Sequence, residues 1–347
     1  MTALVFGFFS FLFFVTSEKR KFDKKLYFSV LFISLLLIVC VRPFDWGADA
    51  DSYIEMYNIV SSGHNVGTEV TFSVISRLVF ALGNCVKLLF IFYAVISLRL
   101  KISAIEKVSY LPAVSFLVYF SCWFILHDVY QIRVGTAIAV SYFSLPYLCG
   151  KKYGKFFLLA LAATLFHIQA ALLFLLIFMP KRRISLYSVL ALLLVLFFSY
   201  AVYFLHIDLL KIILSFLVKT KIPRTEQIEH YYEISQSGII DLGKINAFSP
   251  IVLVRLFLTL FLLFQYRKLN DFLYYPVLIR ILIFSFAVRM FAYPVPVIGM
   301  RVYEFFTCFD VFLFPLFFKV IKEKKAVFAF FILYCLFMLF IVLRSEI

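Results

Sequence analysis

The chain has 347 residues, of which 64% are hydrophobic, and it carries a formal net charge of +15. A soluble globular domain contains only roughly 45–50% apolar residues, whereas the mean hydropathy of this chain is +1.02. A soluble protein is therefore excluded, and the composition predicts an all-α protein that crosses a membrane many times. The basic excess does not indicate nucleic-acid binding, because Lys and Arg cluster in short stretches between apolar runs, as cytoplasmic loops do.

Apolar runs of about the length that a bilayer requires recur along the chain. We expect one integral membrane domain over residues 1–347, with about ten transmembrane helices. The predicted spans lie at about 3–17, 26–41, 70–98, 110–127, 130–149, 185–205, 250–266, 272–292, 302–319 and 326–343. The run at 70–98 is either one tilted helix or two short helices, because Gly83 and Asn84 interrupt it.

The stretch "KFFLLALAATLFHIQAALLFLLIFMPKRR" is basic at both ends and has His167 in its middle. Counting Lys and Arg assigns both of its flanks, and also the cluster at 99–107, to the cytoplasm. This assignment holds if 156–179 enters the membrane and returns to the same side, as a re-entrant hairpin with His167 at its tip. Each arm then has about 11 residues, or ~17 Å, about half of a bilayer. The alternative is a full crossing that violates the charge rule.

This topology leaves two sizeable loops on the outer face, at about 42–69 and 206–249. The second loop has balanced charge, and "PRTEQIEHYYEI" within it predicts a short helix with Thr225 as its N-cap. The first contains "RPFDWGADADSYIEMYN", with three aspartates followed by two tyrosines at i, i+4 spacing: Asp45, Asp49, Asp51, Tyr53 and Tyr57.

Asp51 or Ser52 can cap a short helix in the first loop that places both tyrosines on one face. Aromatic faces beside carboxylates suit the binding of sugars, and Glu69 at the end of the loop can join the same polar surface. The alternative is a capped interfacial helix whose aromatic residues lie in the belt at the membrane surface.

The stretch "HDVYQIRVGTAIAV" places His127 and Asp128 beside Arg133 on the outer side, as further candidates for ligand contact. An arginine at the start of a span can extend to the interface. Small residues after Arg133, beginning with Gly135, instead allow close helix approach and favour an inward-facing side chain.

The stretch "RMFAYPVPVIGMRVYEFF" places Arg289 and Arg301 around a Pro-rich outer turn, with Glu304 three residues after Arg301. Arg301 and Glu304 can form a purely structural pair, but ionisable residues inside a membrane protein are functional candidates by default. Arginines gathered on the outer side predict an anionic ligand, and guanidinium binds phosphate or pyrophosphate bidentately. No Gly-rich phosphate loop or metal-ligand spacing occurs, so neither a metal nor another cofactor is predicted.

The motifs "DADSYIEMY", "QIRVGTAIAV", "LFHIQAAL" and "RVYEFF" occur in that order over about residues 45–310. In this order they resemble the short motifs of EpsG-like and Wzy-type polysaccharide polymerases. The resemblance implies a glycosyltransferase of the C type in the bacterial cytoplasmic (inner) membrane, with its active site facing outward. Such an enzyme transfers the growing glycan from undecaprenyl pyrophosphate to the next lipid-linked repeat unit.

The resemblance implies undecaprenyl-pyrophosphate-linked oligosaccharide as donor and acceptor, the lipid bilayer as surroundings, and a flippase and a chain-length regulator as further partners. Pyrophosphate would be held by Arg133, Arg289 and Arg301, which stabilise the leaving group. The ordinary pKa of a histidine, near ~6.5, suits His167 as general base. The rival candidates for the base are Asp51 and Glu304.

Other classes of membrane protein fit part of the pattern. A flippase or exporter of lipid-linked oligosaccharide would also need an arginine-lined cavity, although the chain lacks the internal repeat expected of many transporters. An enzyme that transfers one sugar from a polyprenyl phosphate would use Asp49 and Asp51 as catalytic or metal-binding residues. An acyltransferase built around His167 is the weakest alternative, because it leaves the arginines without a role.

Overall fold

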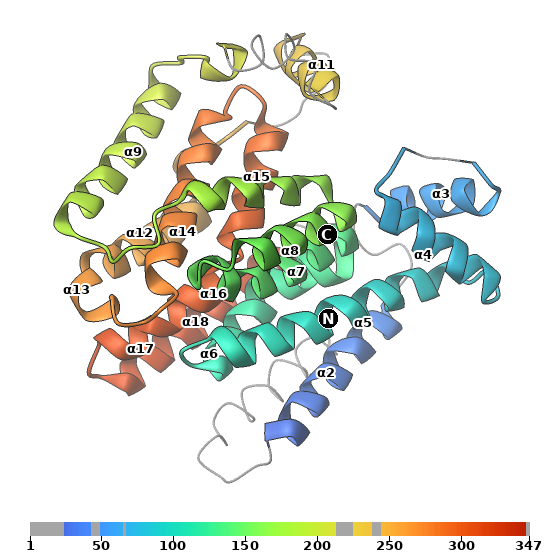
Figure 1. The fold of residues 1–347 in the computed structure, drawn as a ribbon, viewed down its shortest axis with the longest axis horizontal. Helices are drawn as coiled ribbons and strands as arrows, with labels where there is room; N and C mark the ends of the chain where they lie inside the picture. Colours follow the sequence, from blue (N-terminus) through green and yellow to red (C-terminus); the bar gives the residue numbers. More distant parts are fainter. Residues whose placement is uncertain (1–23, 43–48, 65–66, 213–224, 238–243, 345–347) are drawn as a thin grey trace. The chain divides into compact units, whose positions relative to one another are not determined.

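The computed structural model describes residues 24–42, 49–64, 67–212, 225–237 and 244–344, and these residues form helices and no strand (Figure 1). They divide into two compact units. Unit 1 comprises Met1–Met179 with Phe314–Ile347, and unit 2 comprises Pro180–Leu313. The all-helical class expected from the composition is confirmed for the described residues.

Unit 1 is built around the packed pair α5 and α7, with α2 against α5, α8 against α7, and α18 against α6 and η2. Here η2 is a π-helix and η3 and η4 are 3₁₀-helices. The elements are α2 (Lys24–Val41), α3 (Ala50–Ser61), α4 (Val70–Ala81), α5 (Val86–Val108), α6 (Pro112–Tyr119), η2 (Phe120–Tyr130), α7 (Ile132–Cys149), α8 (Tyr153–Phe166), η3 (Ile168–Phe178), η4 (Phe314–Leu316), α17 (Phe317–Val320) and α18 (Lys324–Arg344).

The predicted span at 70–98 is two helices, α4 and α5. The chain turns between them at Gly83 and Asn84, whose φ angles of 126° and 53° are left-handed and incompatible with a continuing helix. Helix α5 then continues through 99–107, so the loop expected there is wrong. The helix can accommodate Lys101 because Asp128 pairs with this buried cation.

The chain reverses at His167. Helix α8 ends at Phe166, His167 is extended with φ −156° and ψ 127°, and η3 begins at Ile168. The rings of Phe157 and Phe174 are 5.0 Å apart, whereas a continuous helix would separate residues at this spacing by ~25 Å. The two arms therefore lie side by side as a helical hairpin, and its re-entrance into a membrane stays a prediction.

Unit 2 is built around α14, which packs against α9, α12, α15 and α16. Its elements are α9 (Leu186–Phe204), α11 (Thr225–Ser237), α12 (Pro250–Phe264), α13 (Tyr266–Leu269), α14 (Tyr275–Phe291), α15 (Pro296–Thr307) and α16 (Asp310–Leu313). The short helix expected in the second outer loop is α11, with Thr225 as its first residue rather than its cap. The predicted span 302–319 is wrong as one helix, because the chain breaks after Thr307 and Pro315 lacks an amide hydrogen.

Several apolar helices make this a membrane protein. Among the described residues, five helices are long and apolar enough to cross a bilayer: Val86–Val108, Pro112–Tyr130, Ile132–Cys149, Leu186–Phe204 and Lys324–Arg344. Shorter apolar helices cover Leu26–Val41, Val70–Ala81, Tyr153–Phe166, Ile168–Phe178 and Pro250–Phe264. The count of about ten spans is not confirmed by these lengths, and the span expected at 3–17 lies outside the described residues.

Candidate functional site

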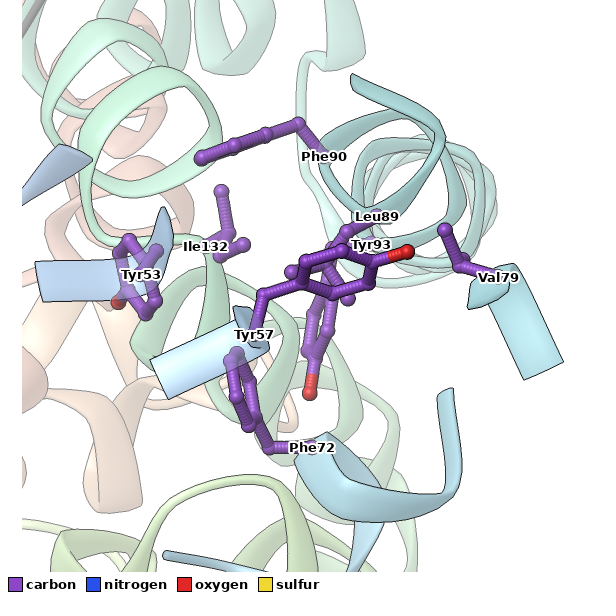
Figure 2. Close-up of a cluster of buried hydrophobic side chains, with 8 residues drawn as sticks. All are labelled: Tyr53, Tyr57, Phe72, Val79, Leu89, Phe90, Tyr93 and Ile132. Atoms are coloured by element: carbon purple, nitrogen blue, oxygen red, sulfur yellow. The ribbon is translucent and has the colours of Figure 1, made fainter. Parts of the chain in front are cut away.

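Aromatic side chains from α3, α4 and α5 gather in a buried cluster in unit 1, together with Ile132 from the start of α7 (Figure 2). Tyr53 and Tyr57 lie on one face of α3, as their spacing predicts, with exposed fractions of only 3% and 1%. The cluster fixes the ends of these helices relative to one another. Its members are Tyr53, Tyr57, Phe72, Val79, Leu89, Phe90, Tyr93 and Ile132.

Glu69 lies at the edge of this cluster and joins three separate segments of unit 1. It occupies the N-cap position of α4, yet its carboxylate makes no capping bond to that helix. Instead, Oε2 accepts a hydrogen bond of 2.6 Å from Nη1 of Arg133. Its Oε1 atom lies 3.2 Å from Nδ1 of His167 and accepts a hydrogen bond of 3.3 Å from the amide of Ile168.

Arg133 is the second residue of α7 and faces the interior of unit 1. Its Cζ atom lies 5.2 Å from the centre of the Tyr53 ring and 5.5 Å from that of Phe72, within the range of cation–π attraction. The side chain keeps 18% of its surface exposed, and its Nε atom has no hydrogen-bond partner among the described residues. Glu69 and the two rings therefore fix the orientation of the guanidinium, and its Nε atom is a buried donor without a partner.

His167 is positioned by the turn between α8 and η3. Its amide donates to the carbonyl of Ala163, and its carbonyl accepts from the amide of Ala170. The hydroxyl of Thr71 donates to the carbonyl of Leu165 at 2.6 Å, which ties α4 to the end of α8. These contacts hold the imidazole beside Glu69.

Electrostatics favour an ionised Glu69. Burial by itself would raise the pKa of this carboxyl, but the contact with His167 and the positive charge of Arg133 outweigh it and lower the pKa from 4.5 to about 2. Burial raises the pKa of Tyr53 above its ordinary value, against the opposing charge of Arg133. The site thus combines a fixed carboxylate, a guanidinium and an imidazole, a set able to bind an anion and to move a proton.

Neither Asp49 nor Asp51 forms an ion pair with Arg133 or His167 in the part of the chain that the structure describes. Asp49 rather than Asp51 or Ser52 is the N-cap of α3, because the helix begins at Ala50. Asp51 is exposed, since residues two positions apart, such as Asp51 and Tyr53, point to opposite sides of a helix. Asp45 lies outside the described residues. Sugar binding by Asp49, Tyr53 and Tyr57 stays a prediction, and the burial of both tyrosines favours a packing role.

His127 and Asp128 are both buried within η2. His127 stacks on Trp123, with ring centres 5.5 Å apart. Asp128 forms a buried ion pair of 2.6 Å with Lys101 and accepts hydrogen bonds from Tyr119, at 2.6 Å, and from Ser97. The contact of Asp128 with a sugar stays a prediction, because its carboxylate is already engaged inside unit 1.

The other predicted arginines belong to unit 2. Arg289 is buried on α14, donates to the carbonyl of Asn246 at 3.2 Å and lies 5.4 Å from the ring centre of Tyr303. Arg301 is exposed and Glu304 half-buried on α15, and in the described part of the chain no ion pair joins them. A common anion site of these arginines with Arg133 stays a prediction.

Arg42, which the sequence analysis did not single out, is buried close to the same aromatic cluster. It donates to the carbonyl of Val129, and its Cζ atom lies 4.0 Å from the ring centre of Phe90, which packs on Tyr53. Its Nη2 atom has no hydrogen-bond partner among the described residues. The sequence did contain a signal for Arg42. It directly follows the predicted span 26–41 on the predicted outer side, where the positive-inside rule expects few cations.

The model of the EpsG family matches residues 25–347 of this chain. The chain belongs to the EpsG family. A search of curated proteins and a search of solved structures each found no match. Membership in the EpsG family supports a polysaccharide polymerase-like role and confirms the resemblance inferred from the four motifs. Within the described residues of this EpsG-family protein, no cluster of His, Cys, Asp and Glu is arranged to hold a metal ion.

Proposed function

We propose that this EpsG-family protein is a glycosyltransferase that polymerises lipid-linked oligosaccharide repeat units at the outer face of the bacterial cytoplasmic membrane. It transfers the growing glycan from undecaprenyl pyrophosphate to the non-reducing end of the next undecaprenyl-pyrophosphate-linked repeat. The observation that carries the proposal is the meeting of Glu69, Arg133 and His167, which supplies an anion-binding cation and a proton acceptor at one place.

In the reaction, His167 accepts the proton of the acceptor hydroxyl as the hydroxyl oxygen bonds to the anomeric carbon of the donor. The bond between that carbon and the pyrophosphate oxygen breaks, and undecaprenyl pyrophosphate leaves with the bonding electron pair. Arg133 stabilises the charge that develops on this leaving group, because guanidinium is always ionised and matches phosphate geometry. Arg289 and Arg301 are proposed to bind pyrophosphate of the lipid-linked substrates as well.

The proposed topology places the hairpin α8–η3 as a re-entrant element with His167 at its tip. Non-helical backbone at membrane depth is tolerated when it is buried in protein or lines a wet cavity. Support comes from the basic residues at both flanks of the hairpin and from the reversal of the chain at His167. Asp51 and Glu304 remain the rival bases, although Asp51 faces away from the aromatic cluster.

The direct test is reconstitution of the purified protein with its undecaprenyl-pyrophosphate-linked repeat unit, with a chelator and without nucleotide, followed by a gel of the products. A ladder spaced by whole repeat units supports a polymerase that needs no added metal or nucleotide. Unchanged substrate would overturn the proposal in favour of transport or of single-sugar transfer, which a flipping assay and a polyprenyl-phosphate-sugar donor separate.

Two variants, each with a matched control, test the proposed roles of His167 and Arg133. His167→Gln should lower the rate by about 10²–10⁴-fold, the usual contribution of a positioned base, whereas the exposed His64→Gln should have no effect. Arg133→Lys should raise KM and lower kcat, because Lys cannot bind phosphate bidentately. Its control is Arg77→Lys on the exposed side of α4. Full polymer length and rate in His167→Gln would exclude the base role.

A further inference from the structure

The contacts of the Glu69 carboxylate are unusual for a residue at an N-cap position. A polar residue at an N-cap commonly accepts a hydrogen bond from its own helix, but the Glu69 carboxylate makes no such bond to α4. It accepts hydrogen bonds from Nη1 of Arg133 and from the amide of Ile168, and it lies 3.2 Å from Nδ1 of His167. Ile168 is the first residue of η3, so its amide lies at a helix N-terminus, where a nearby negative charge is favoured.

The contact with Glu69 bears on which nitrogen of His167 carries hydrogen. An ionised carboxylate only accepts hydrogen bonds, so a neutral imidazole can satisfy it only with hydrogen on Nδ1. The Nδ1 atom is buried and makes no well-aligned hydrogen bond among the described residues, and the Glu69 carboxylate 3.2 Å away is the charged group beside it. The 13% of the His167 side chain that stays exposed lies on other atoms, and Nε2 is not among the buried atoms without a partner.

We propose that Glu69 is a positioning residue that holds His167 in the tautomer with hydrogen on Nδ1, so that Nε2 is the atom that accepts the proton of the acceptor hydroxyl. When Nε2 takes that proton, the adjacent carboxylate stabilises the imidazolium. The other carboxylate oxygen keeps Arg133 in place, so one side chain sets the distance between the base and the phosphate-binding cation. This inference rests on the proposed function and replaces the sugar contact expected of Glu69.

The first test needs no substrate. Protein labelled with ¹⁵N-histidine in lipid nanodiscs is studied by NMR at neutral pH, with the His167 signals assigned by their loss in His167→Gln. The wild type should show Nδ1 protonated and Nε2 unprotonated. In Glu69→Gln the preference should be lost, because an amide can donate to Nδ1 as well as accept from it. A wild-type ring with hydrogen on Nε2, or an unchanged tautomer in Glu69→Gln, would overturn the inference.

The second test is kinetic. Glu69→Gln should lower kcat by at least about 100-fold and change KM far less, because loss of the partner that sets the tautomer of a catalytic histidine costs as much as about 10⁴-fold in the serine proteases. The matched control is Glu55→Gln, at an exposed position of α3, which should behave as wild type. In the His167→Gln background, Glu69→Gln should add little, since a positioning residue acts through the base.

The two tests separate the inference from the function on which it rests. Equal kcat losses for Glu69→Gln with and without His167 would show that Glu69 acts independently of the histidine and would refute the inference. A wild-type protein that forms no polymer would refute the proposed function and with it the catalytic role of Glu69. The tautomer measured by NMR would then still decide whether Glu69 orients His167.

Discussion

At the scale of the residue, the charge of Glu69 should make the stability of the protein depend on pH. Its folded-state pKa of about 2 lies below its ordinary value of 4.5. The stabilisation that Glu69 contributes is therefore fully present above pH 4.5 and is lost as the pH falls through about 2. The melting temperature of Glu69→Gln should differ from that of wild type above pH 4.5, and the difference should shrink as the pH falls below it.

Melting curves in detergent across this acid range measure the effect. The exposed Glu55→Gln variant provides the baseline, because acid acts on the remaining carboxyl groups equally in both variants. A difference between wild type and Glu69→Gln that did not change with pH would contradict an ionised, paired Glu69.

Asp128 and Lys101 should contribute to stability rather than to ligand binding. Both side chains are almost completely buried and are 2.6 Å apart. Removing one partner leaves an unpaired buried charge at a cost of about 3–5 kcal/mol, whereas replacing both with apolar residues of similar volume is often neutral. Asp128→Leu and Lys101→Met should each lower the melting temperature strongly. The double variant should recover only the part of the loss that the unpaired charge causes, because Asp128→Leu also leaves the hydroxyls of Tyr119 and Ser97 without their acceptor.

The double variant also distinguishes a structural from a functional carboxylate. If Asp128 contacts the sugar, as the sequence indicated, the double variant will be stable but will have a raised KM for the lipid-linked repeat. If the pair is structural, the stable double variant will keep the KM of the wild type. The burial of Asp128 within η2 favours the second outcome.

Single residues could be selected from the sequence more reliably than their partners could. Glu69, Arg133 and His167 were each candidates, because placing an ionisable side chain in apolar surroundings costs free energy and therefore indicates a function. The contacts among them could not be predicted, since they depend on how α4, α7 and the α8–η3 turn pack. The ion pair of Asp128 could not be predicted for the same reason, because its partner Lys101 stands in a basic stretch typical of a loop.

At the scale of the element, Gly135 is expected to set the position of Arg133. A Cβ atom added to Gly135 would lie 1.8 Å from the carbonyl oxygen of His127 and 2.7 Å from its carbon. Both obstacles are backbone atoms of η2, so the start of α7 would have to move away, and Arg133 two residues earlier would move with it. Gly135→Ala should therefore lower both the melting temperature and the polymerisation rate.

The matched control is Gly154→Ala in α8, where an added Cβ meets nothing within 4 Å. There, alanine should stabilise the helix by roughly 0.5–1 kcal/mol, because it loses less conformational freedom on folding. A Gly135→Ala protein with the stability and rate of wild type would exclude a close approach of η2 to α7.

The breaks in the elements were predictable to different degrees. Gly83 and Asn84 marked the turn between α4 and α5 in the sequence, because both residue types tolerate a positive φ. The break at His167 was inferred from the charges at the two flanks of the hairpin. The π-helix η2 left no comparable signal in the sequence, because its apolar composition does not differ from that of an ordinary buried helix.

At the scale of the whole molecule, a re-entrant hairpin would place both of its flanks on the same side of the membrane, and this can be tested. Lys152 and Arg183 flank the hairpin and are both exposed. If 156–179 returns to the side from which it enters, cysteines at these two positions face the cytoplasm together. Lys152→Cys and Arg183→Cys should then both resist an impermeant maleimide in intact spheroplasts, and both should react after permeabilisation.

The labelling is carried out in a background with Cys40, Cys85 and Cys149 replaced by Ser, because Cys85 is exposed and the other two are half-buried. Glu55→Cys, in the loop that the proposed topology places outside, is the control and should react in intact spheroplasts. Reaction of only one flanking cysteine before permeabilisation would mean that 156–179 crosses the bilayer. His167 would then lie within a segment that crosses the membrane. The positive-inside rule, from which the hairpin was predicted, would not hold for this segment.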